Sequence, residues 1–366
     1  MDPSEPRPVR VLIVDDSALM RKLLGDLLRS SPAIEVVGSA RDGMEALALA
    51  ERLRPDVVTL DVEMPGLSGL DVLPTLLKTH PVPVVMVSAL TQEGAEVTLA
   101  ALELGAVDFL PKPDRHQVAG LKESRDLLIA KVLSAARSRV RPPRERDREV
   151  PARRVSPSAV RDPAVPPAAS AGEGPVTPCL LIGISTGGPQ ALAQVLPLLT
   201  PPIPPVLIVQ HMPAKFTYVF AERLSRQCSV PVKEAEQGDR VLPNAILIAP
   251  GGRHMTLTGS PSGVRVTLSD GPLVSGHKPS VDMLFQSGAR VYRSAAIGII
   301  MTGMGRDGVE GCKKILDAGG QTFGQDEQTS VVYGMNKAAF QERAVQSQFA
   351  LLDLPALIQR LARSGS

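Results

Sequence analysis

The chain has 366 residues, a length that accommodates two or three domains, and 43% of them are hydrophobic. Aromatic residues make up only 3% and tryptophan is absent, which argues against a surface that stacks nucleic-acid bases. A net charge of +2 argues against a dominant nucleic-acid or membrane-surface role. The 3 cysteines form no CxxC pair, and we find neither a signal peptide nor a membrane-spanning apolar run, so we expect a cytoplasmic protein.

Strands and helices alternate over about residues 8–136, the expected first domain. Apolar runs predict strands at 9–14, 34–37, 57–60, 84–87 and 107–110, and helical spacing follows each run. Ser17 is the expected N-cap of the first helix. Five strand–helix units in a row predict a doubly wound parallel α/β sheet.

Acidic and polar residues come at the ends of these strands. Asp15 and Asp16 follow the first strand and Asp61 the third. Ser88 ends the fourth strand and Lys112 follows the fifth. Because the carboxyl ends of parallel strands line one crevice, the three carboxylates would repel one another unless Mg²⁺ lay between them. Each residue alone fits a loop, cap or turn, but together they favour a phosphoryl group on Asp61, with Lys112 and Ser88 beside it.

The first domain resembles a two-component receiver domain, which has a flavodoxin-like fold with a five-stranded parallel sheet. The motifs that carry the resemblance are Asp15-Asp16, Asp61-Val62-Glu63-Met64-Pro65-Gly66, Ser88-Ala89 and Lys112-Pro113. The resemblance implies that Asp61 accepts phosphate from a histidine kinase, and that Asp15 and Asp16 hold Mg²⁺ beside Asp61. It also implies that Ser88 and Phe109 report phosphorylation, although a phenylalanine there equally suits a core.

Arginine, proline and alanine dominate residues 137–176, and no apolar period runs through them. A segment of this composition cannot bury a core, so we expect a flexible linker. Its arginines could attract an acidic partner or nucleic acid, but a solvated linker is the preferred interpretation.

Strands and helices alternate again over about residues 177–363, the expected second domain. Strands are predicted at 179–184, 206–210, 245–249, 264–268, 296–301 and 321–323, with a hairpin around 259–263. Helices are predicted at 190–198, 217–227, 281–292, 308–318 and 354–361. The pattern predicts a second α/β domain built on a parallel sheet.

A glycine-rich turn, Gly183-Ile184-Ser185-Thr186-Gly187-Gly188-Pro189, lies between a predicted strand and a predicted helix. Its glycines permit a sharp turn and the close approach of a substrate. Ser185 would then present its hydroxyl near the amides of a helix N-terminus. Turns of this kind also bind phosphate, so the motif alone leaves both possibilities open.

A histidine and an aspartate follow two other strands of the second domain. His211 follows the strand at 206–210, and Asp307 lies after the strand at 296–301. His211 would take the proton from Ser185, and Asp307 would orient the imidazole, as acyl transfer requires. The backbone near Met304 could supply an amide to an oxyanion.

Other assignments stay open on the residues alone. His254 and His277 lie in expected loops and are rival bases, and Asp307 could merely cap the helix after it. The turn also fits the nucleophile elbow of α/β-hydrolases, in which Asp239 or Asp270 would precede His277 as the base. Neither of those two aspartates follows a clear central strand, so the order serine, histidine, aspartate is preferred.

The second domain resembles the catalytic domain of the chemotaxis protein-glutamate methylesterase family. The matching motifs are the serine turn above, Gln210-His211-Met212-Pro213, Ala249-Pro250-Gly251-Gly252-Arg253-His254-Met255, Lys278-Pro279-Ser280-Val281-Asp282 and Thr302-Gly303-Met304-Gly305-Arg306-Asp307-Gly308. The resemblance implies Ser185 as nucleophile, His211 as base and Asp307 as the third member. Met304 would contribute to the oxyanion site, and Thr186 would form a hydrogen bond or simply shape the turn.

The resemblance implies a phosphorylation-activated hydrolase that removes methyl groups from glutamate methyl esters on methyl-accepting chemoreceptors, releasing methanol, and that deamidates receptor glutamines. It implies Mg²⁺ for the receiver, no cofactor for the esterase chemistry, and a monomer that binds chemoreceptors and a histidine kinase but no nucleic acid and does not insert into the membrane. Two rivals stay open: another α/β-hydrolase joined to a receiver, and a non-enzymatic regulator that works by binding.

Overall fold

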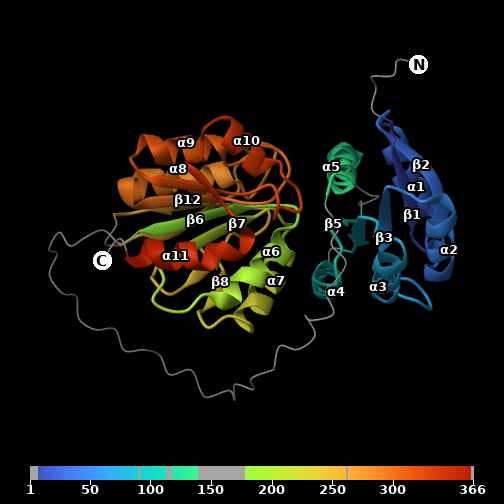
Figure 1. Ribbon diagram of the computed structural model, residues 1–366, viewed down its shortest axis with the longest axis horizontal. Coiled ribbons are helices and arrows are strands. Elements are labelled where there is room, and N and C mark those ends of the chain that lie inside the picture. Colours follow the sequence, from blue (N-terminus) through green and yellow to red (C-terminus); the bar gives the residue numbers. More distant parts are fainter. Residues whose placement is uncertain (1–6, 90, 113–117, 139–177, 261–262, 364–366) are drawn as a thin grey trace.

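The computed structural model describes residues 7–89, 91–112, 118–138, 178–260 and 263–363, and Figure 1 shows two α/β domains. Apart from residues 137 and 138, the predicted linker lies outside the described residues. None of the helices in the described part of the chain combines the length and apolar character needed to cross a bilayer.

The first domain alternates strands and helices as predicted. Its elements are β1 (Val9–Val14), α1 (Ala18–Arg29), β2 (Ile34–Ala40), α2 (Gly43–Leu53), β3 (Val57–Asp61), α3 (Gly69–Thr79), β4 (Val84–Ser88), α4 (Gln92–Glu103), β5 (Asp108–Pro111) and α5 (Val118–Ala136). The strands pair in parallel in the order β2-β1-β3-β4-β5, which confirms the doubly wound sheet. Alternate strand residues face α1 and α5 on one side and α2, α3 and α4 on the other. Ser17 caps α1 as predicted, since its hydroxyl accepts a hydrogen bond from the Met20 amide at 3.4 Å.

The second domain begins after the linker and is larger. Its elements are β6 (Cys179–Ile184), α6 (Gly188–Val195), β7 (Val206–Gln210), α7 (Phe216–Ser225), β8 (Val232–Glu234), β9 (Ile246–Ile248), β10 (His254–Thr258), β11 (Arg265–Ser269), α8 (Val281–Tyr292), β12 (Ala296–Ile300), α9 (Val309–Asp317), β13 (Gln321–Gln325), α10 (Met335–Gln341), β14 (Ser347–Phe349) and α11 (Leu354–Arg363), with short 3₁₀ turns at Leu196–Leu198, Arg293–Ala295 and Leu351–Asp353.

A seven-stranded parallel sheet in the order β14-β13-β12-β6-β7-β9-β8 forms the centre of this domain. Its apolar faces are covered by α6, α7 and α11 on one side and by α8, α9 and α10 on the other. Strands β10 and β11 pair as the predicted antiparallel hairpin and pack on the α8 side. The central strands β6, β7 and β12 are neighbours, so the loops that follow them meet at one edge of the sheet.

The sequence did not predict β8, β14 or α10, and it gave no range for β10, the first strand of the predicted hairpin. The expectation that His254 lies in a loop is wrong, because this residue begins β10 and its backbone pairs with Ser269 of β11. Strand β10 comes shortly after two glycines, and its apolar residues alternate with polar threonines. It therefore lacks the continuous apolar run that marked the central strands.

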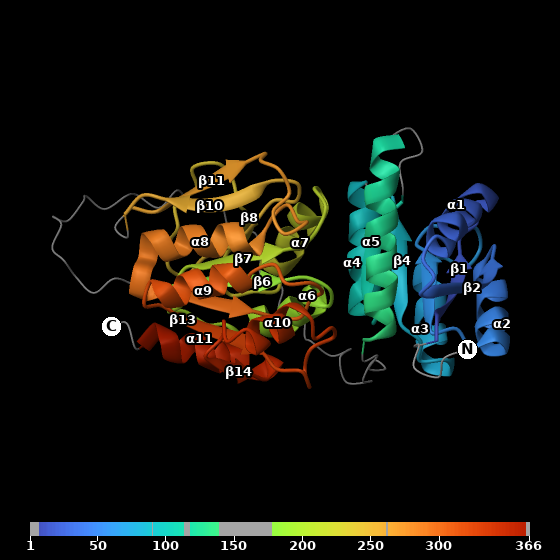
Figure 2. The ribbon, with the colours of Figure 1, turned by 90° about the horizontal axis from the view of Figure 1, so that it is seen from above.

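The two domains pack through α4 of the first and α6 and α7 of the second. Figure 2 shows α4 and α5 on the side of the first domain that faces the second. Phe109 of β5 stacks on Phe216 of α7 with ring centroids 4.6 Å apart, and both rings are buried. One apolar cluster therefore continues from the first domain into the second.

Candidate active site and acidic receiver site

The serine turn leaves β6 and enters α6 in a space that only glycine fits. Gly187 has a φ of +79°, and a Cβ there would fall 2.5 Å from the Cβ of Val331. The Ser185 amide donates to the Thr302 carbonyl at 3.0 Å, and the Gln210 side chain donates to the Ser185 carbonyl at 3.0 Å. The turn is thus tied to the end of β7 and to the loop after β12, and Ser185 is 9% exposed.

His211 and Asp307 meet beside this turn. The Nε2 atom of His211 lies 2.9 Å from an Asp307 carboxylate oxygen, and Asp307 is buried. Burial acts to raise the pKa of Asp307, but the hydrogen bond and charge of His211 outweigh it, so the pKa is lower than usual. The buried carboxylate therefore stays ionised and can hold the imidazole and stabilise its cation.

Asp307 also accepts three hydrogen bonds from the start of α8. They come from the Val281 amide at 2.8 Å, the Asp282 amide at 3.0 Å and the Ser280 hydroxyl at 2.9 Å. The expectation that Asp307 could cap its own following helix is wrong, because Gly308 is the N-cap of α9 and carries no side-chain cap. The aspartate instead joins the N-terminus of α8 to the histidine.

The serine and the histidine each keep one unused polar atom. His211 Nδ1 is buried without a hydrogen-bond partner, and across the described ranges no partner is found for the Ser185 hydroxyl either. No hydrogen bond joins Ser185 to His211 in the described part of the chain, and such bonds are often long before substrate binds. The arrangement thus supplies one of the two hydrogen bonds of a triad, between His211 and Asp307, and the free atoms for the other.

The loop after β12 approaches the serine closely, as the Met304 assignment requires. A Cβ on Gly303 would fall 2.7 Å from the Ser185 Cβ, so no larger residue fits there. The Thr302 hydroxyl donates to the Thr186 carbonyl at 2.9 Å, which ties this loop to the serine turn. The backbone beside Met304 is therefore near the nucleophile.

The rival acids and bases have other partners. His254 is buried and its Nε2 lies 2.8 Å from the Pro272 carbonyl. Asp270 pairs with Arg253 at 3.0 Å, and Asp239 accepts hydrogen bonds from Lys233 and the Glu236 amide. Neither aspartate bonds to a histidine in the part of the chain that the structure describes, so the α/β-hydrolase order finds no support. His277 does reach the site, where its ring stacks on that of His211.

Residues of the first domain reach the serine turn. The Thr186 hydroxyl donates to Asp108 of β5 at 2.5 Å, and Lys131 of α5 donates to the other oxygen of Asp108 at 2.6 Å. The Gln190 side chain donates to the Ala106 carbonyl. Sequence reasoning missed Asp108 and Lys131, because only the packing of two domains across a linker places them beside the turn.

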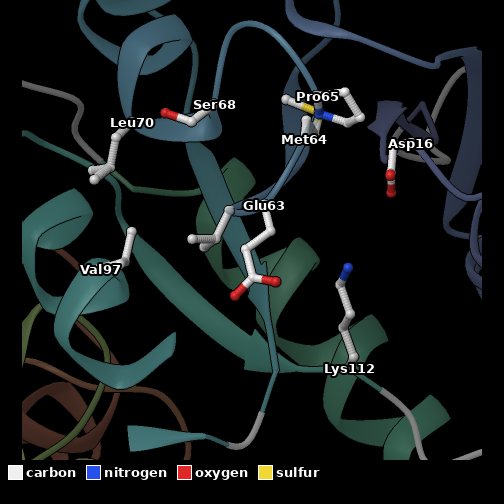
Figure 3. Close-up of a pocket in the computed structure, with 9 residues that line it drawn as sticks. Asp16, Glu63, Met64, Pro65, Ser68, Leu70, Val97 and Lys112 are labelled. Atoms are coloured by element: carbon white, nitrogen blue, oxygen red, sulfur yellow. The ribbon is translucent and has the colours of Figure 1, made fainter. Parts of the chain in front are cut away.

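A second polar cluster lies at the carboxyl edge of the first sheet. Asp15, Asp16 and Asp61 each offer an oxygen, and these atoms lie within 4.8 Å of one another. Lys112 donates to Asp61 at 2.6 Å and lies 3.7 Å from Asp15. Burial raises the pKa of Asp61 to about 6 against the opposing effect of Lys112, and burial likewise raises the pKa of Asp15. Figure 3 shows Asp16 and Lys112 on the wall of the adjoining pocket, which Glu63 also lines.

This cluster fits Mg²⁺. An Asp15 oxygen is buried without a hydrogen-bond partner, and three close carboxylates form an all-oxygen donor set with too few cations to neutralise it. Ser88 lies at the end of β4, where its hydroxyl donates to the Gly94 carbonyl at 3.2 Å. Pro113 of the Lys-Pro motif lies outside the described residues.

Known proteins resemble the chain over nearly its whole length. A family model described as CheB methylesterase matches residues 180–358, and one described as response regulator receiver domain matches residues 11–119. A protein-glutamate methylesterase/protein-glutamine glutaminase of Pyrococcus abyssi (strain GE5 / Orsay) is 43% identical over 360 residues, with 98% of this chain and 95% of that protein covered. One of Koribacter versatilis (strain Ellin345) is 45% identical over 354 residues, with 96% and 95% covered. The crystal structure of the Thermotoga maritima CheB methylesterase catalytic domain covers 51% of this chain and 98% of its own at 35% identity, with a TM-score of 0.49.

Proposed function

The chain belongs to the CheB methylesterase family and carries a response regulator receiver domain, and on that premise we propose that it demethylates glutamate methyl esters on methyl-accepting chemoreceptors. The observation that carries the proposal is the hydrogen-bonded His211–Asp307 pair beside the glycine-rich turn of Ser185. These three residues come from the ends of neighbouring parallel strands, where substrates bind in α/β domains.

The geometry supports an acyl-enzyme route. The Ser185 oxygen attacks the ester carbonyl while its proton passes to Nδ1 of His211, the nitrogen that Asp307 leaves free. The carbonyl oxygen becomes an oxyanion near the backbone around Met304. Collapse of this tetrahedral intermediate expels methoxide, which takes the proton from His211 and leaves as methanol. Water then hydrolyses the serine ester, which frees the glutamate side chain of the receptor and restores the Ser185 hydroxyl.

The same steps would deamidate a glutamine side chain. The leaving group is then ammonia instead of methanol, and the acyl-enzyme and its hydrolysis are unchanged. The relatives of this chain are named as both methylesterase and glutaminase, which supports extending the proposal to this second reaction.

The first domain would gate this chemistry. The contacts from Asp108 to Thr186 and from Ala106 to Gln190 place it against the serine turn, where a receptor side chain would have to enter. Phosphorylation of Asp61 would shift the population toward an arrangement in which the domains separate. Phe109 lies in the interface and would link the two events.

Asp15, Asp16 and Asp61 would hold Mg²⁺ for the phosphorylation reaction, in which the ion supplies charge neutralisation for the transferred phosphoryl group. Lys112, already bonded to Asp61, would contact the phosphoryl group from the protein side, and Ser88 would donate to it. A histidine kinase would be the phosphate donor. The enzyme would work as a cytoplasmic monomer at the receptor surface, with no nucleic-acid partner.

Methanol release from methylated receptor membranes tests both domains at once. The purified chain is assayed with Mg²⁺, with and without a small phosphodonor, beside Ser185→Ala and Asp61→Asn variants. We expect release that increases with phosphodonor, disappears in Ser185→Ala and no longer responds to phosphodonor in Asp61→Asn. Release that ignores phosphodonor would remove the gating proposal, and release that persists in Ser185→Ala would remove the esterase mechanism.

A further inference from the structure

The ring of His277 lies flat against the ring of His211. The two centroids are 3.8 Å apart and the ring planes differ by 8°, which is a parallel stack. His211 already has its partner in Asp307, and the only histidine ring that touches it in the described part of the chain is His277. The family motifs described above do not give His277 a role.

The loop that carries His277 is fixed in place. Val274 and His277 exchange both backbone hydrogen bonds, at 3.1 and 2.9 Å, around a tight turn in which Ser275 and Gly276 have φ values of +52° and +79°. The Ser275 hydroxyl donates to Asp282 at 3.0 Å, and the Lys278 ammonium donates to the Gly271 carbonyl at 3.1 Å. The ring is therefore presented by a braced loop and not by a free one.

A stacked ring restricts a motion that Asp307 alone permits. A single hydrogen bond from Nε2 leaves the imidazole of His211 free to swing about that bond, which would move Nδ1 away from the serine. A flat neighbour at 3.8 Å allows only the parallel plane without a clash. The stack thus defines where the proton-accepting atom lies.

The charges around His277 favour a neutral ring. Burial lowers its pKa to about 4, the neighbouring His211 and Lys131 of α5 add to that effect, and Asp307 opposes it. At neutral pH the ring therefore presents an uncharged aromatic face to His211. An uncharged face attracts an imidazolium, whereas a second cation would repel it.

We propose that His277 is a positioning residue, which holds the plane of the His211 ring and stabilises its cation by stacking, and which neither accepts nor donates a proton in the reaction. The proposal rests on the proposed acyl-enzyme chemistry and adds a residue to it. It also assigns the general base to His211 and not to His277, because a general base must take up a proton and a stacking ring need not.

The test compares His277→Phe, which keeps a flat ring without a titratable group, with His277→Leu, which is apolar but has no flat ring. The full chain is assayed with Mg²⁺ and phosphodonor for methanol release and for hydrolysis of p-nitrophenyl acetate, and kcat and KM are determined separately. We expect His277→Leu to lose about tenfold or more in kcat with little change in KM, and His277→Phe to stay within about threefold of the unaltered chain.

Two outcomes would overturn the proposal. If His277→Phe is as inactive as His211→Ala, His277 takes part in proton transfer and is not merely a stacking ring. If the Leu and Phe variants match each other, whether both active or both impaired, stacking makes no contribution. The unaltered chain could also hydrolyse p-nitrophenyl acetate through Ser185 but leave methylated receptors intact. That result contradicts the methylesterase proposal alone, and the rates of p-nitrophenyl acetate hydrolysis then decide between the His277 variants.

Discussion

At the scale of single residues, one carboxylate organises the active site. Asp307 accepts hydrogen bonds from His211, from two amides of α8 and from the Ser280 hydroxyl, so every lone pair that faces the protein is used. Such saturation fixes the carboxylate in one orientation and keeps it ionised despite burial. The imidazole is therefore oriented by a group that cannot itself turn.

Replacing Asp307 with asparagine would test this orientation. The amide keeps the shape of the side chain, but its NH₂ group must replace one of two accepting oxygens. One oxygen accepts from His211 and the Val281 amide, and the other accepts from the Ser280 hydroxyl and the Asp282 amide, so the NH₂ group faces donors in either orientation. We expect kcat to fall by about 10⁴-fold, as for a triad whose tautomer is wrong. The measurement is the rate of p-nitrophenyl acetate hydrolysis, with circular dichroism to show that the variant is folded. A loss below tenfold would contradict the role.

The low pKa of His277 predicts a pH dependence of stability. The unfolded residue titrates near 6.5 and the folded one near 4, so between these values the unfolded chain binds more protons. Above pH 6.5 the ring is neutral in both the folded and the unfolded chain, so its burial does not make the free energy of unfolding depend on pH. As the pH falls from 6.5 toward 4, only the unfolded chain takes up the proton, and the free energy of unfolding decreases. His277→Phe should remove about 1 to 3 kcal/mol of this loss between pH 7 and pH 4. Urea unfolding of both chains at the two pH values measures it, and equal losses would contradict it.

At the scale of elements, helices α8 and α9 cap each other through two aspartates. Asp307, just before α9, accepts amides of α8, while Asp282 of α8 accepts the Gly308 amide at 3.0 Å and the Gly311 amide at 2.7 Å. Each helix N-terminus thus receives a carboxyl group from the start of the other helix. The low pKa of Asp307 keeps its carboxylate charged, which the dipole of α8 favours. Because Gly308 is the neighbour of Asp307, the cap on α9 also places the carboxylate that holds His211.

Asp282→Ala should therefore weaken both stability and activity. Two buried amides lose their acceptor, which costs about 2 to 4 kcal/mol of unfolding free energy. Asp282→Asn can keep the single oxygen to which both amides donate and gives up only the oxygen that accepts from the Ser275 hydroxyl, so it should lose no more than about 1 kcal/mol. Urea unfolding gives the stability, and kcat at a temperature where all three chains are folded gives the activity. A variant that loses stability while its kcat is unchanged would show that the cap does not position Asp307.

The sequence predicted most of the elements because their signals are local. Runs such as residues 206–210 and 296–301 are long and apolar, and each matches a central strand within a residue or so. Strands β8 and β14 have three residues each, too few to show a period, and owe their place to neighbouring strands. The serine, histidine and aspartate of the site were predictable because each follows a strand. The stack of His277 on His211 was not, because it depends on how a loop after the β10–β11 hairpin folds back.

At the scale of the whole molecule, the domains meet through an apolar centre with polar contacts around it. Phe109 and Phe216 form the buried centre, and an ion pair between Glu103 of α4 and Arg223 of α7 lies at the exposed rim. Exposed pairs of this kind contribute about 0.2 to 1 kcal/mol. Under the proposed gating, the rim would therefore adjust an equilibrium between closed and open arrangements that the apolar centre mainly determines.

Replacing the acid of this ion pair with a base tests the proposed gating without altering the candidate active site or the acidic cluster of the first domain. Glu103→Arg places two cations together and should raise methanol release without phosphodonor by about twofold to tenfold. The matched control, Glu103→Arg with Arg223→Glu, restores opposite charges and should bring release back down. A single variant that behaves like the unaltered chain, or a double variant that stays elevated, would contradict a closed resting arrangement held by this interface.

The apolar cluster that both domains share has a consequence for heat stability. While the domains are docked, neither can melt without exposing the buried side of the other, so the resting chain should absorb heat in a single calorimetric transition. Under the proposed gating, phosphorylation of Asp61 parts the domains, and the same chain should then show two weaker transitions and more sites for proteases. An activated enzyme would then also be a shorter-lived one, and the cell's proteases would limit how long each signal lasts.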